Sequence, residues 1–158
     1  MDGSTTGLVL RTADLDEPQT RALLALHLAG MHANTPAEHV HALDLSALQA
    51  PELSVWTAWR GDRVAGVGAL KDHGGGLGEI KSMRTHPDHL GQGVGAAVLL
   101  HIMAQARARG LTRLSLETGV GEPFAAALRL YARYGFEYGG AFAQYEPSEY
   151  CQFMHLAL

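Results

Sequence analysis

The sequence predicts a single α/β domain built on a mixed sheet, and three of its features lead to that class. The chain has 158 residues, the usual size of one domain, and no repeat or linker divides it. In the first half, short alternating apolar runs are separated by turns, as in an antiparallel meander. In the second half, a long helical stretch precedes another strand, which is the pattern of a parallel crossover. We therefore expect one domain over residues 1–158.

The N-terminal half is predicted to hold one long helix and four strands. The helix spans residues 17–30, where apolar residues recur at helical spacing and Gly30 offers a stop. Residues 31–51 are polar and contain several histidines, and a short helix or an ordered loop is expected there. The turn-forming tetrad Arg-Gly-Asp-Arg at 60–63 joins two of the strands in a hairpin. The four strands cover residues 8–11, 53–59, 64–70 and 78–85.

The C-terminal half is predicted to hold two helices and two strands. The first helix is indicated by an apolar stripe. Arginines in its last turn and Gly110 just beyond it favour its expected end. Because this helix connects two strands, those strands should run parallel to each other in the sheet. The predicted helices are 93–109 and 124–134, and the predicted strands are 111–116 and 151–158.

Composition and charge exclude several classes of partner. Apolar residues make up 47% of the chain and charged residues 18%, which is typical of a globular protein. The net charge of −4 gives no attraction for nucleic acid or for an anionic membrane. The N-terminus lacks the features of a signal peptide, and no apolar run reaches the roughly 20 residues that cross a bilayer. A single cysteine, Cys151, allows no internal disulfide, so a cytoplasmic location is the default expectation.

The most informative segment is a glycine-rich loop that leads into the first helix of the second half. It reads Leu90-Gly-Gln-Gly-Val-Gly95. Glycines there let the backbone adopt positive φ and approach a ligand closely, while free amides at the start of the helix point outward. Such a helix start binds anions, typically phosphates. The first helical turn carries no acidic residue, so its positive pole is uncompensated.

The residues alone leave other interpretations of this loop open. One is a tight turn that serves only the structure. Another is a dinucleotide site, because Gly91, Gly93 and Ala96 satisfy G-x-G-x-x-G/A and Glu117 ends the next strand about 20 residues later. Against a dinucleotide site, charged residues crowd a preceding strand that should be apolar, and five residues separate this strand from the glycines. A phosphate-loop NTPase is excluded, since no Gly-Lys-Ser/Thr follows.

Two blocks of sequence together resemble the GNAT superfamily of acetyltransferases. The first block, Met83-Arg-Thr-His-Pro87 followed by Leu90-Gly-Gln-Gly-Val-Gly95, is similar to a strand ending in Val-x-Pro and the acetyl-CoA motif R/Q-x-x-G-x-G/A. Leu90 departs from this pattern and costs one side-chain contact. The second block, Leu130-Tyr-Ala-Arg-Tyr-Gly-Phe136, looks like L-Y-x-x-x-G-F. The likeness covers residues 53–138. The stretches Glu79-Ile-Lys-Ser-Met-Arg-Thr85 and Leu116-Glu-Thr-Gly119 also look like a bacterial subgroup of this superfamily, the small-molecule acetyltransferases.

This resemblance implies the GNAT fold, a mostly antiparallel mixed sheet whose parallel strand pair splays apart, flanked by helices. It also implies an N-acetyltransferase that moves the acetyl group of acetyl-CoA directly to the amine of a small molecule. The pantetheine arm would lie along the strand before the loop, where a backbone amide can hold the thioester carbonyl. The residues expected to bind acetyl-CoA are Met83, Arg84, Thr85, Leu90, Gly91, Gln92, Gly93, Val94, Gly95 and Ala96.

Tyr131 is the candidate general acid. The leaving thiolate needs a proton, and a phenol with a pKa near 10 is an adequate donor to a thiolate whose thiol has a pKa near 8.5. The position of Tyr131 within the second block matches the position of this tyrosine in the family. If Gly135 ends the helix in a Schellman motif, however, Tyr131 would also pack on Phe136, and a purely structural role remains open.

The acceptor amine must lose a proton, so a general base is also expected. Glu79 is the first candidate, because strand alternation places it on the same side as Lys81 and Met83. Glu117, at the end of the next strand, is the second candidate. A solvated or ion-paired surface role for Glu79 stays open, and a β-bulge in its strand would reverse the side to which later residues point.

Residues outside the two blocks are expected to form the acceptor pocket, although an ordered surface loop is an equal alternative for residues 31–44. The candidate substrate-binding residues are His32, His41, Asp44, Glu117 and Tyr145. No metal is expected, because the pairs at 39/41 and 86/89 lack a cysteine or carboxylate at a recognisable spacing. A homodimer is left open, since small GNAT domains often dimerise. The alternative functions are a non-catalytic acyl-CoA-binding domain and a dinucleotide-binding oxidoreductase.

Overall fold

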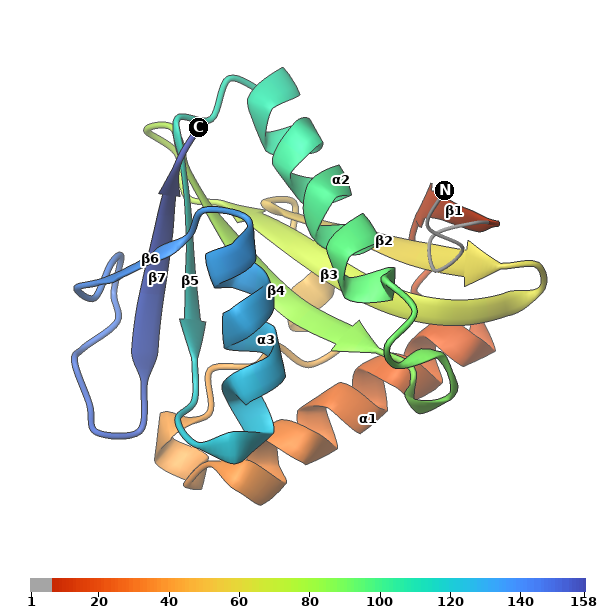
Figure 1. Ribbon diagram of the computed structural model, residues 1–158, viewed down its shortest axis with the longest axis horizontal. Coiled ribbons are helices and arrows are strands. Elements are labelled where there is room, and N and C mark those ends of the chain that lie inside the picture. The colour runs from red at the N-terminus through yellow and green to blue at the C-terminus, as the bar shows by residue number, and fades with distance from the viewer. Residues whose placement is uncertain (1–6) are drawn as a thin grey trace.

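The computed structural model describes residues 7–158; residues 1–6 of the predicted domain lie outside the described part. A seven-stranded sheet with the order β1-β2-β3-β4-β5-β7-β6 forms the centre, and three α-helices flank it (Figure 1). The predicted mixed sheet is confirmed, since β4 and β5 are parallel while all other neighbours are antiparallel. The strands are β1 (Leu8–Thr12), β2 (Leu53–Arg60), β3 (Arg63–Asp72), β4 (Leu77–Thr85), β5 (Arg113–Thr118), β6 (Glu137–Gly139) and β7 (Gln152–Ala157).

The helices follow the predicted order, with three additional single turns of 3₁₀ helix. Two of these turns fall in the segment 31–51, where a short helix or an ordered loop was expected. Within residues 7–158, no helix is both long and apolar enough to cross a membrane. The α-helices are α1 (Pro18–Asn34), α2 (Val94–Ala108) and α3 (Glu122–Arg133), and the 3₁₀ turns are η2 (Ala37–His39), η3 (Ala47–Gln49) and η4 (Pro87–His89).

The main core lies in two layers, one on each face of the sheet, and a smaller buried cluster contains Phe142, Cys151 and Phe153. Alternation along β3 divides the layers: Leu70 packs with the residues of α2 and α3, whereas Val67 packs with those of α1. Two glycines of β3 allow α2 to come close to the sheet. A Cβ at Gly66 would lie 2.5 Å from Cγ1 of Val94, and one at Gly68 would lie 2.6 Å from Cγ1 of Val98. The start of α2, and the glycine loop before it, are thereby held tightly over β3.

The prediction that Gly30 ends α1 is wrong, because this helix continues to Asn34. The reason for a glycine here is a close approach by Arg84 of β4. A Cβ at position 30 would lie 2.8 Å from Nη2 of that arginine. The same guanidinium donates a hydrogen bond from Nε to Nδ1 of His27, 3.2 Å away. Gly30 thus makes room for a cation against the helix and does not act as a terminator.

β4 and β5 separate shortly after they begin to pair. Their parallel register runs only from Leu77 to Glu79 on β4, whereas β5 continues to pair with β7 as far as Thr118. Along β3, the register shifts so that Ser82 and Met83 of β4 stand opposite the single residue Gly68. Ser82 has φ 55°, as expected for a bulged residue with left-handed backbone. The predicted splayed pair is therefore present, and a β-bulge lies beside the opening.

The bulge changes which side chains share a face of β4. Glu79 and Lys81 point to the same side and bond to each other. Met83 points to the opposite side, where its sulfur lies beneath α2 and close to Gly68. The expectation that Met83 faces the same way as Glu79 and Lys81 is therefore wrong, because one extra residue reverses the alternation.

Candidate active site

A groove runs between the end of β4, the start of α2, α3 and the second half of α1, and we call it the glycine groove. It has a volume of about 400 Å³. Gly91 and Gly93, which precede α2, have φ 72° and 78°, so the predicted positive φ of the loop is confirmed. The residues that line the glycine groove include His27, Met31, Met83, Arg84, Thr85, Leu90, Gly95, Pro123, Phe124, Ala127, Leu130 and Tyr131.

The start of α2 offers backbone donors to this groove. Gly93 is the N-cap and has no side chain to cap the helix, and no acidic residue lies in the first turn. The amides of Val94, Gly95 and Ala96 thus have no acceptor within the helix. A Cβ at Gly95 would lie 3.2 Å from Cδ2 of Leu130, so the missing side chain keeps the groove open between α2 and α3.

Half of the predicted acetyl-CoA residues line this groove, namely Met83, Arg84, Thr85, Leu90 and Gly95. Gly91, Gln92, Gly93 and Ala96 form the loop and first turn beside it. Val94 differs, because its side chain is buried in the core against β3. Only the backbone amide of Val94 is in a position to meet a ligand.

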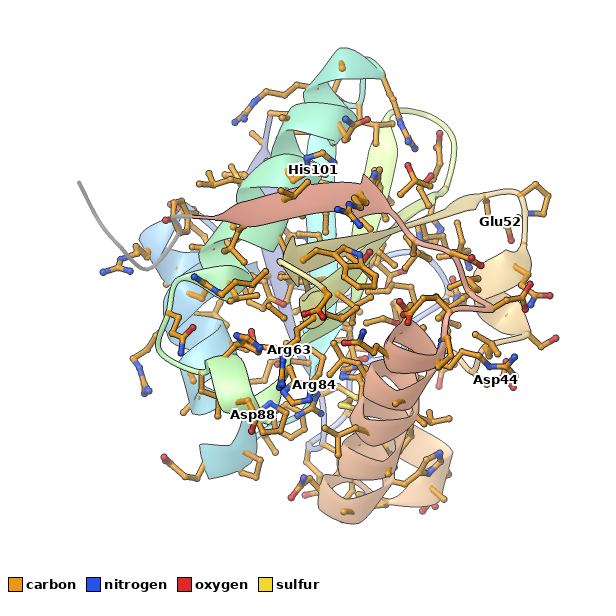
Figure 2. All side chains as sticks on the ribbon, turned by 90° about the vertical axis from the view of Figure 1, so that its right-hand side faces the viewer. Asp44, Glu52, Arg63, Arg84, Asp88 and His101 are labelled. Carbon is orange, nitrogen blue, oxygen red and sulfur yellow. The ribbon has the colours of Figure 1, made fainter. Side chains whose placement is uncertain are left out.

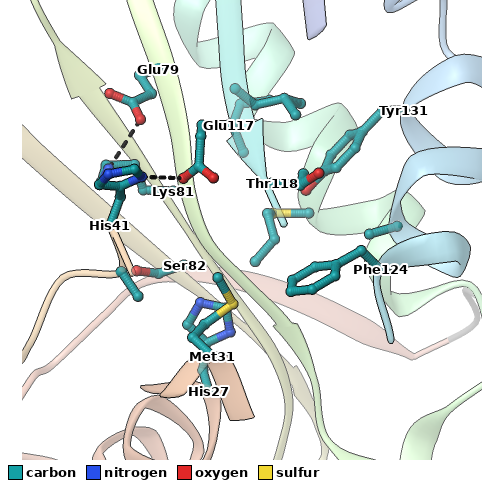
Figure 3. A pocket seen from close by; sticks show the side chains of 15 residues that line it. His27, Met31, His41, Glu79, Lys81, Ser82, Glu117, Thr118, Phe124 and Tyr131 are labelled. Atoms are coloured by element: carbon teal, nitrogen blue, oxygen red, sulfur yellow. Dashed lines mark hydrogen bonds and ion pairs between the residues drawn. The ribbon is translucent and has the colours of Figure 1, made fainter. Parts of the chain in front are cut away.

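A second, smaller pocket of about 90 Å³ opens where β4 and β5 separate, and we call it the carboxylate pocket (Figure 3). It shares several lining residues with the glycine groove, Tyr131 among them. The two spaces therefore meet at the Tyr131 side chain. The lining residues are His27, Met31, His41, Ala42, Glu79, Ile80, Lys81, Ser82, Met83, Leu116, Glu117, Thr118, Phe124, Ala127 and Tyr131.

Tyr131 packs against Phe136 and also lines both the glycine groove and the carboxylate pocket. Its ring lies 5.7 Å from that of Phe136, measured between centroids. The amide of Phe136 donates to the carbonyl of Tyr131 over 3.1 Å, and Gly135 has φ 98°, so the predicted Schellman motif ends α3. The hydroxyl end of Tyr131 points toward Thr118 of β5 (Figure 3). Burial raises the pKa of Tyr131 above its ordinary value, which keeps the phenol protonated.

Glu79 is enclosed by hydrogen-bond donors. Its Oε1 lies 2.8 Å from Nε2 of His73, and its Oε2 accepts bonds from Nζ of Lys81 at 3.0 Å and from the hydroxyl of Tyr145 at 2.5 Å. Only 1% of Glu79 is exposed, and only 8% of the Lys81 side chain. The sequence allowed a solvated or ion-paired surface role for Glu79. The structure shows the ion pair with Lys81, but the pair is buried.

Glu117 lies at the end of β5 across the opening, where its Oε1 is 3.2 Å from Nδ1 of His41. The Glu117 side chain is 7% exposed, while that of His41 is 30% exposed. Burial raises the pKa of Glu117 above its ordinary value, and the nearby His41, Cys151 and Lys81 oppose this change. Glu117 has fewer donors around it than Glu79 and keeps a free side toward the pocket (Figure 3).

Ser82, at the bulge of β4, adds a donor without a partner. Its hydroxyl oxygen is buried and makes no hydrogen bond with any residue in the described part of the chain. Buried polar groups are almost always paired, so an unpaired hydroxyl in the wall of a pocket indicates a place where a ligand can bond.

His27 is a site residue that sequence reasoning missed. It lies on the buried stripe of α1, four residues after Leu23 and four before Met31, and a polar residue on such a stripe is the signal that could have revealed it. Burial, with a further contribution from the charge of Arg84, lowers the pKa of His27 to about 4. His27 is therefore neutral at pH 7, and its Nδ1 can accept the bond from Arg84.

The five predicted substrate-binding residues differ in where the structure places them. His41 and Glu117 face each other in the carboxylate pocket. Tyr145 does not line this pocket, but its hydroxyl bonds to Glu79 and Lys81 behind the wall. His32 is exposed on α1. Asp44 is exposed and accepts a bond from the amide of Ala47, and it lies on the other side of α1 from Arg84 (Figure 2).

Comparison with known proteins identifies the family to which the chain belongs. Residues 20–136 match the model of the Acetyltransferase (GNAT) family. The chain is 42% identical over 149 residues to YedL, an uncharacterised N-acetyltransferase of Escherichia coli, with 94% of each chain covered. It is 45% identical over 145 residues to YsnE, an uncharacterised N-acetyltransferase of Bacillus subtilis, covering 92% of this chain and 96% of the relative.

Solved structures agree with these sequence matches. A crystal structure of a candidate acyl-CoA N-acyltransferase from Klebsiella pneumoniae superimposes with a TM-score of 0.81. The two chains are 30% identical, and the match covers 96% of this chain and 97% of the other. The likeness of the fold therefore extends over nearly the whole chain.

Proposed function

Because the chain belongs to the GNAT family of acetyltransferases, we propose that it acetylates the amine of a small molecule with acetyl-CoA as donor. The observation that carries this proposal is the meeting of two unlike spaces at Tyr131. One is a long groove with backbone donors at the start of α2, and the other is a small pocket with two buried carboxylates. They meet where β4 and β5 separate. Membership of an acetyltransferase family also favours this donor over a dinucleotide at the glycine loop.

The glycine groove fits the phosphates and the extended arm of acetyl-CoA. The uncapped start of α2 presents amides to an anion, and the absence of side chains at Gly93 and Gly95 lets a bulky group come close. When bound, acetyl-CoA supplies the acetyl group as a thioester. Met83, Arg84 and Thr85 line the path from the helix start to the pocket. The bulge at Ser82 provides a hydroxyl without a partner for a carbonyl at the end of that path.

Tyr131 is proposed to be the general acid. Its hydroxyl lies where groove and pocket meet, and burial keeps its proton in place until a stronger base develops beside it. Burial raises the pKa of a thiol in the same way, so donor and leaving thiolate remain matched within the cleft. The packing of the Tyr131 ring on Phe136 fixes the direction of the hydroxyl, so the structural and catalytic roles are compatible.

The geometry favours Glu117 over Glu79 as the general base. The Glu79 carboxylate already accepts bonds from Lys81 and Tyr145 and meets His73, so little of it is free to take a proton. Glu117 has a pKa above its ordinary value, which makes it a stronger base than a solvated carboxylate. We therefore assign proton removal from the amine to Glu117, positioned by His41. Glu79 would hold Lys81 and Tyr145 in the pocket wall.

The size of the carboxylate pocket supports a compact acceptor group. About 90 Å³ is available, and apolar side chains such as Met31, Leu116 and Phe124 form part of the wall. An ammonium group would be attracted to Glu117 before losing its proton, while a small apolar portion would contact those side chains. These features support a small amine with a short apolar substituent.

The test begins with calorimetric titration of the protein with acetyl-CoA, with NADH and ATP as controls. We expect saturable binding of acetyl-CoA alone, and then thiol release when a panel of small primary amines is added. Binding of acetyl-CoA without turnover on any amine would point to a non-catalytic acyl-CoA-binding domain. Absence of acetyl-CoA binding would refute the proposed donor.

A further inference from the structure

Three potential metal ligands meet beside the carboxylate pocket, from segments far apart in the sequence. His41 comes from the loop between η2 and η3, Glu117 from the end of β5, and Cys151 from the residue just before β7. Their ligand atoms all lie within 4.8 Å of one another. Nδ1 of His41 is 3.2 Å from Oε1 of Glu117 and 4.0 Å from Sγ of Cys151.

From this arrangement we propose that His41, Glu117 and Cys151 form a binding site for a divalent transition-metal ion, with Zn²⁺ the best match. Nitrogen, oxygen and sulfur donors of these residue types are the ligands that Zn²⁺ takes in proteins. With bonds of 2.0–2.3 Å in a tetrahedron, neighbouring ligand atoms would be about 3.3–3.8 Å apart. The two separations from His41, 3.2 and 4.0 Å, lie on either side of this range, and all three ligand atoms lie within 4.8 Å of one another, so side-chain rotations would bring them to a shared ion.

The surroundings favour a cation at this place. Cys151 is buried and Glu117 almost so, and their acidic groups face each other with only His41 as a basic partner in the cluster. The charge of Lys81 also acts on Glu117, but its ammonium is already bonded to Glu79 and Tyr145. Partial exposure of the His41 side chain, 30%, offers a way in from the pocket.

Other histidines of this region have different partners. Nδ1 of His39 is 3.2 Å from the hydroxyl of Ser148, and its ring lies 4.7 Å from that of Tyr150. The spacing His39-Val-His41 is therefore not the basis of the site. No local motif predicts the cluster, because its ligands are 76 and 34 positions apart along the chain. The expectation of no metal is revised by this proposal.

Three protein ligands would leave a fourth position of a tetrahedral ion open. Glu117 and His41 line the carboxylate pocket, so this position would face the acceptor end of the cleft. If the proposed function is correct, a bound Zn²⁺ would occupy the Glu117 carboxylate, which could then neither attract the ammonium group of the acceptor nor remove its proton. The site would then be inhibitory, and Zn²⁺ would compete with the amine and not with acetyl-CoA.

The test uses the full chain without a histidine tag, because a tag would itself bind the metal. Titration with Co²⁺ near neutral pH should give a thiolate-to-cobalt charge-transfer band that saturates at one ion per chain. Calorimetry with Zn²⁺ should give the same stoichiometry. Cys151→Ser should abolish the band and weaken Zn²⁺ binding at least about tenfold, since even outer partners of metal ligands are worth 10–100-fold. His32→Ala, which removes an exposed histidine away from the cluster, should leave both unchanged.

A second variant, together with a check of folding, separates loss of a metal ligand from loss of the fold. Glu117→Gln should keep the charge-transfer band but lower the Co²⁺ and Zn²⁺ affinities, and circular dichroism would verify that each variant is folded. Lack of a thiolate band in the unmodified protein, or equal Zn²⁺ affinity in Cys151→Ser, would overturn the proposal. These measurements need neither acetyl-CoA nor amine. Failure of the metal site is therefore distinguishable from failure of the proposed acetyl transfer.

Discussion

The glycine groove and the carboxylate pocket meet at one tyrosine but are built in different ways. The donor side of the groove is one continuous stretch, residues 83–96, which offers backbone amides, while α1 and α3 supply the other walls. The pocket depends on polar and charged side chains from α1, the loop after η2, β4 and β5, which only the tertiary fold brings together. Damage to the groove should therefore affect binding of the donor. Damage to the pocket should affect turnover and should leave donor binding intact.

The largest effect is expected from Gly93→Glu. This change places bulk and a negative charge at the start of α2, where the phosphates of the donor are proposed to bind. We expect calorimetry to show acetyl-CoA affinity reduced by more than about 10³-fold, equivalent to about 4 kcal/mol. Gly110→Glu is the matched control, because Gly110 also has φ 78° but follows the other end of α2. If both variants bound acetyl-CoA equally well, the groove would not be the donor site.

Glu117→Gln should have the next largest effect, on rate and not on donor affinity. Removal of a general base typically costs about 10²–10⁴-fold in rate, and we expect kcat/KM for the amine to fall within this range. In the unmodified protein, kcat/KM should rise as the pH rises through the pKa of Glu117, which lies above the ordinary value of a glutamate. Steady-state kinetics as a function of pH should show this limb lost in the variant.

Glu79→Gln provides the contrast to Glu117→Gln within the same pocket. It would leave the buried Lys81 without its counter-charge, and breaking a buried pair in this way costs about 3–5 kcal/mol. Its main effect should thus be on the free energy of unfolding, measured by denaturant titration. A folded and fully stable Glu79→Gln protein that had lost catalysis would return the role of base to Glu79.

Tyr131→Phe should lower kcat by about 10²-fold while acetyl-CoA affinity and thermal stability stay close to those of the unmodified protein. The phenylalanine keeps the ring contact with Phe136 and removes only the hydroxyl. Tyr134→Phe, one turn further along, serves as the control, and kcat should not change in it. Unchanged kcat in Tyr131→Phe would leave that residue with its structural contact alone.

The smallest effect concerns His27, which lines both spaces and has a pKa of about 4. The unfolded chain binds a proton at this histidine near pH 6.5, whereas the folded protein resists it until about pH 4. The contribution to stability is therefore complete above pH 6.5 and is lost as the pH falls toward 4, by about 2–3 kcal/mol. Denaturant titrations at several pH values should give a smaller loss over this range in His27→Gln; an identical loss would contradict the assignment.

The sequence was informative where short-range rules decide the outcome. The succession of helices and strands along the chain, the parallel pair, the glycine loop and the Schellman motif at Gly135 all follow from local patterns, and the structure confirms them. The insertion of β7 between β5 and β6 was not predicted. Gly30 was misjudged because its function is a long-range approach by Arg84, which no local pattern records. The reversal at Met83 has a similar origin, since a bulge depends on pairing with β3.

The carboxylate pocket was harder to predict for the same reason. The sequence identified both Glu79 and Glu117 as carboxylates near the opening. Their hydrogen-bond partners decide which of the two can take up a proton. These partners, Tyr145 and His41, come from segments whose positions cannot be predicted from local sequence patterns. Asp44 and His32 lie in the expected segment, yet they point to solvent because helix phase and a capping bond place them there.

The separation of β4 from β5 also has a mechanical consequence. In the part of the chain that the structure describes, the ladder between the four-stranded and the three-stranded part of the sheet is short: β4 and β5 pair from Leu77 to Glu79, and Gly76 accepts two further backbone bonds just before it. The weakest line of the sheet thus coincides with the cleft, and local opening should begin along it, as faster hydrogen exchange in the ends of β4 and β5 would report. A donor bound between β4 and β5 would contact both parts of the sheet. Its binding should therefore raise the free energy of unfolding and slow local opening between the two strands.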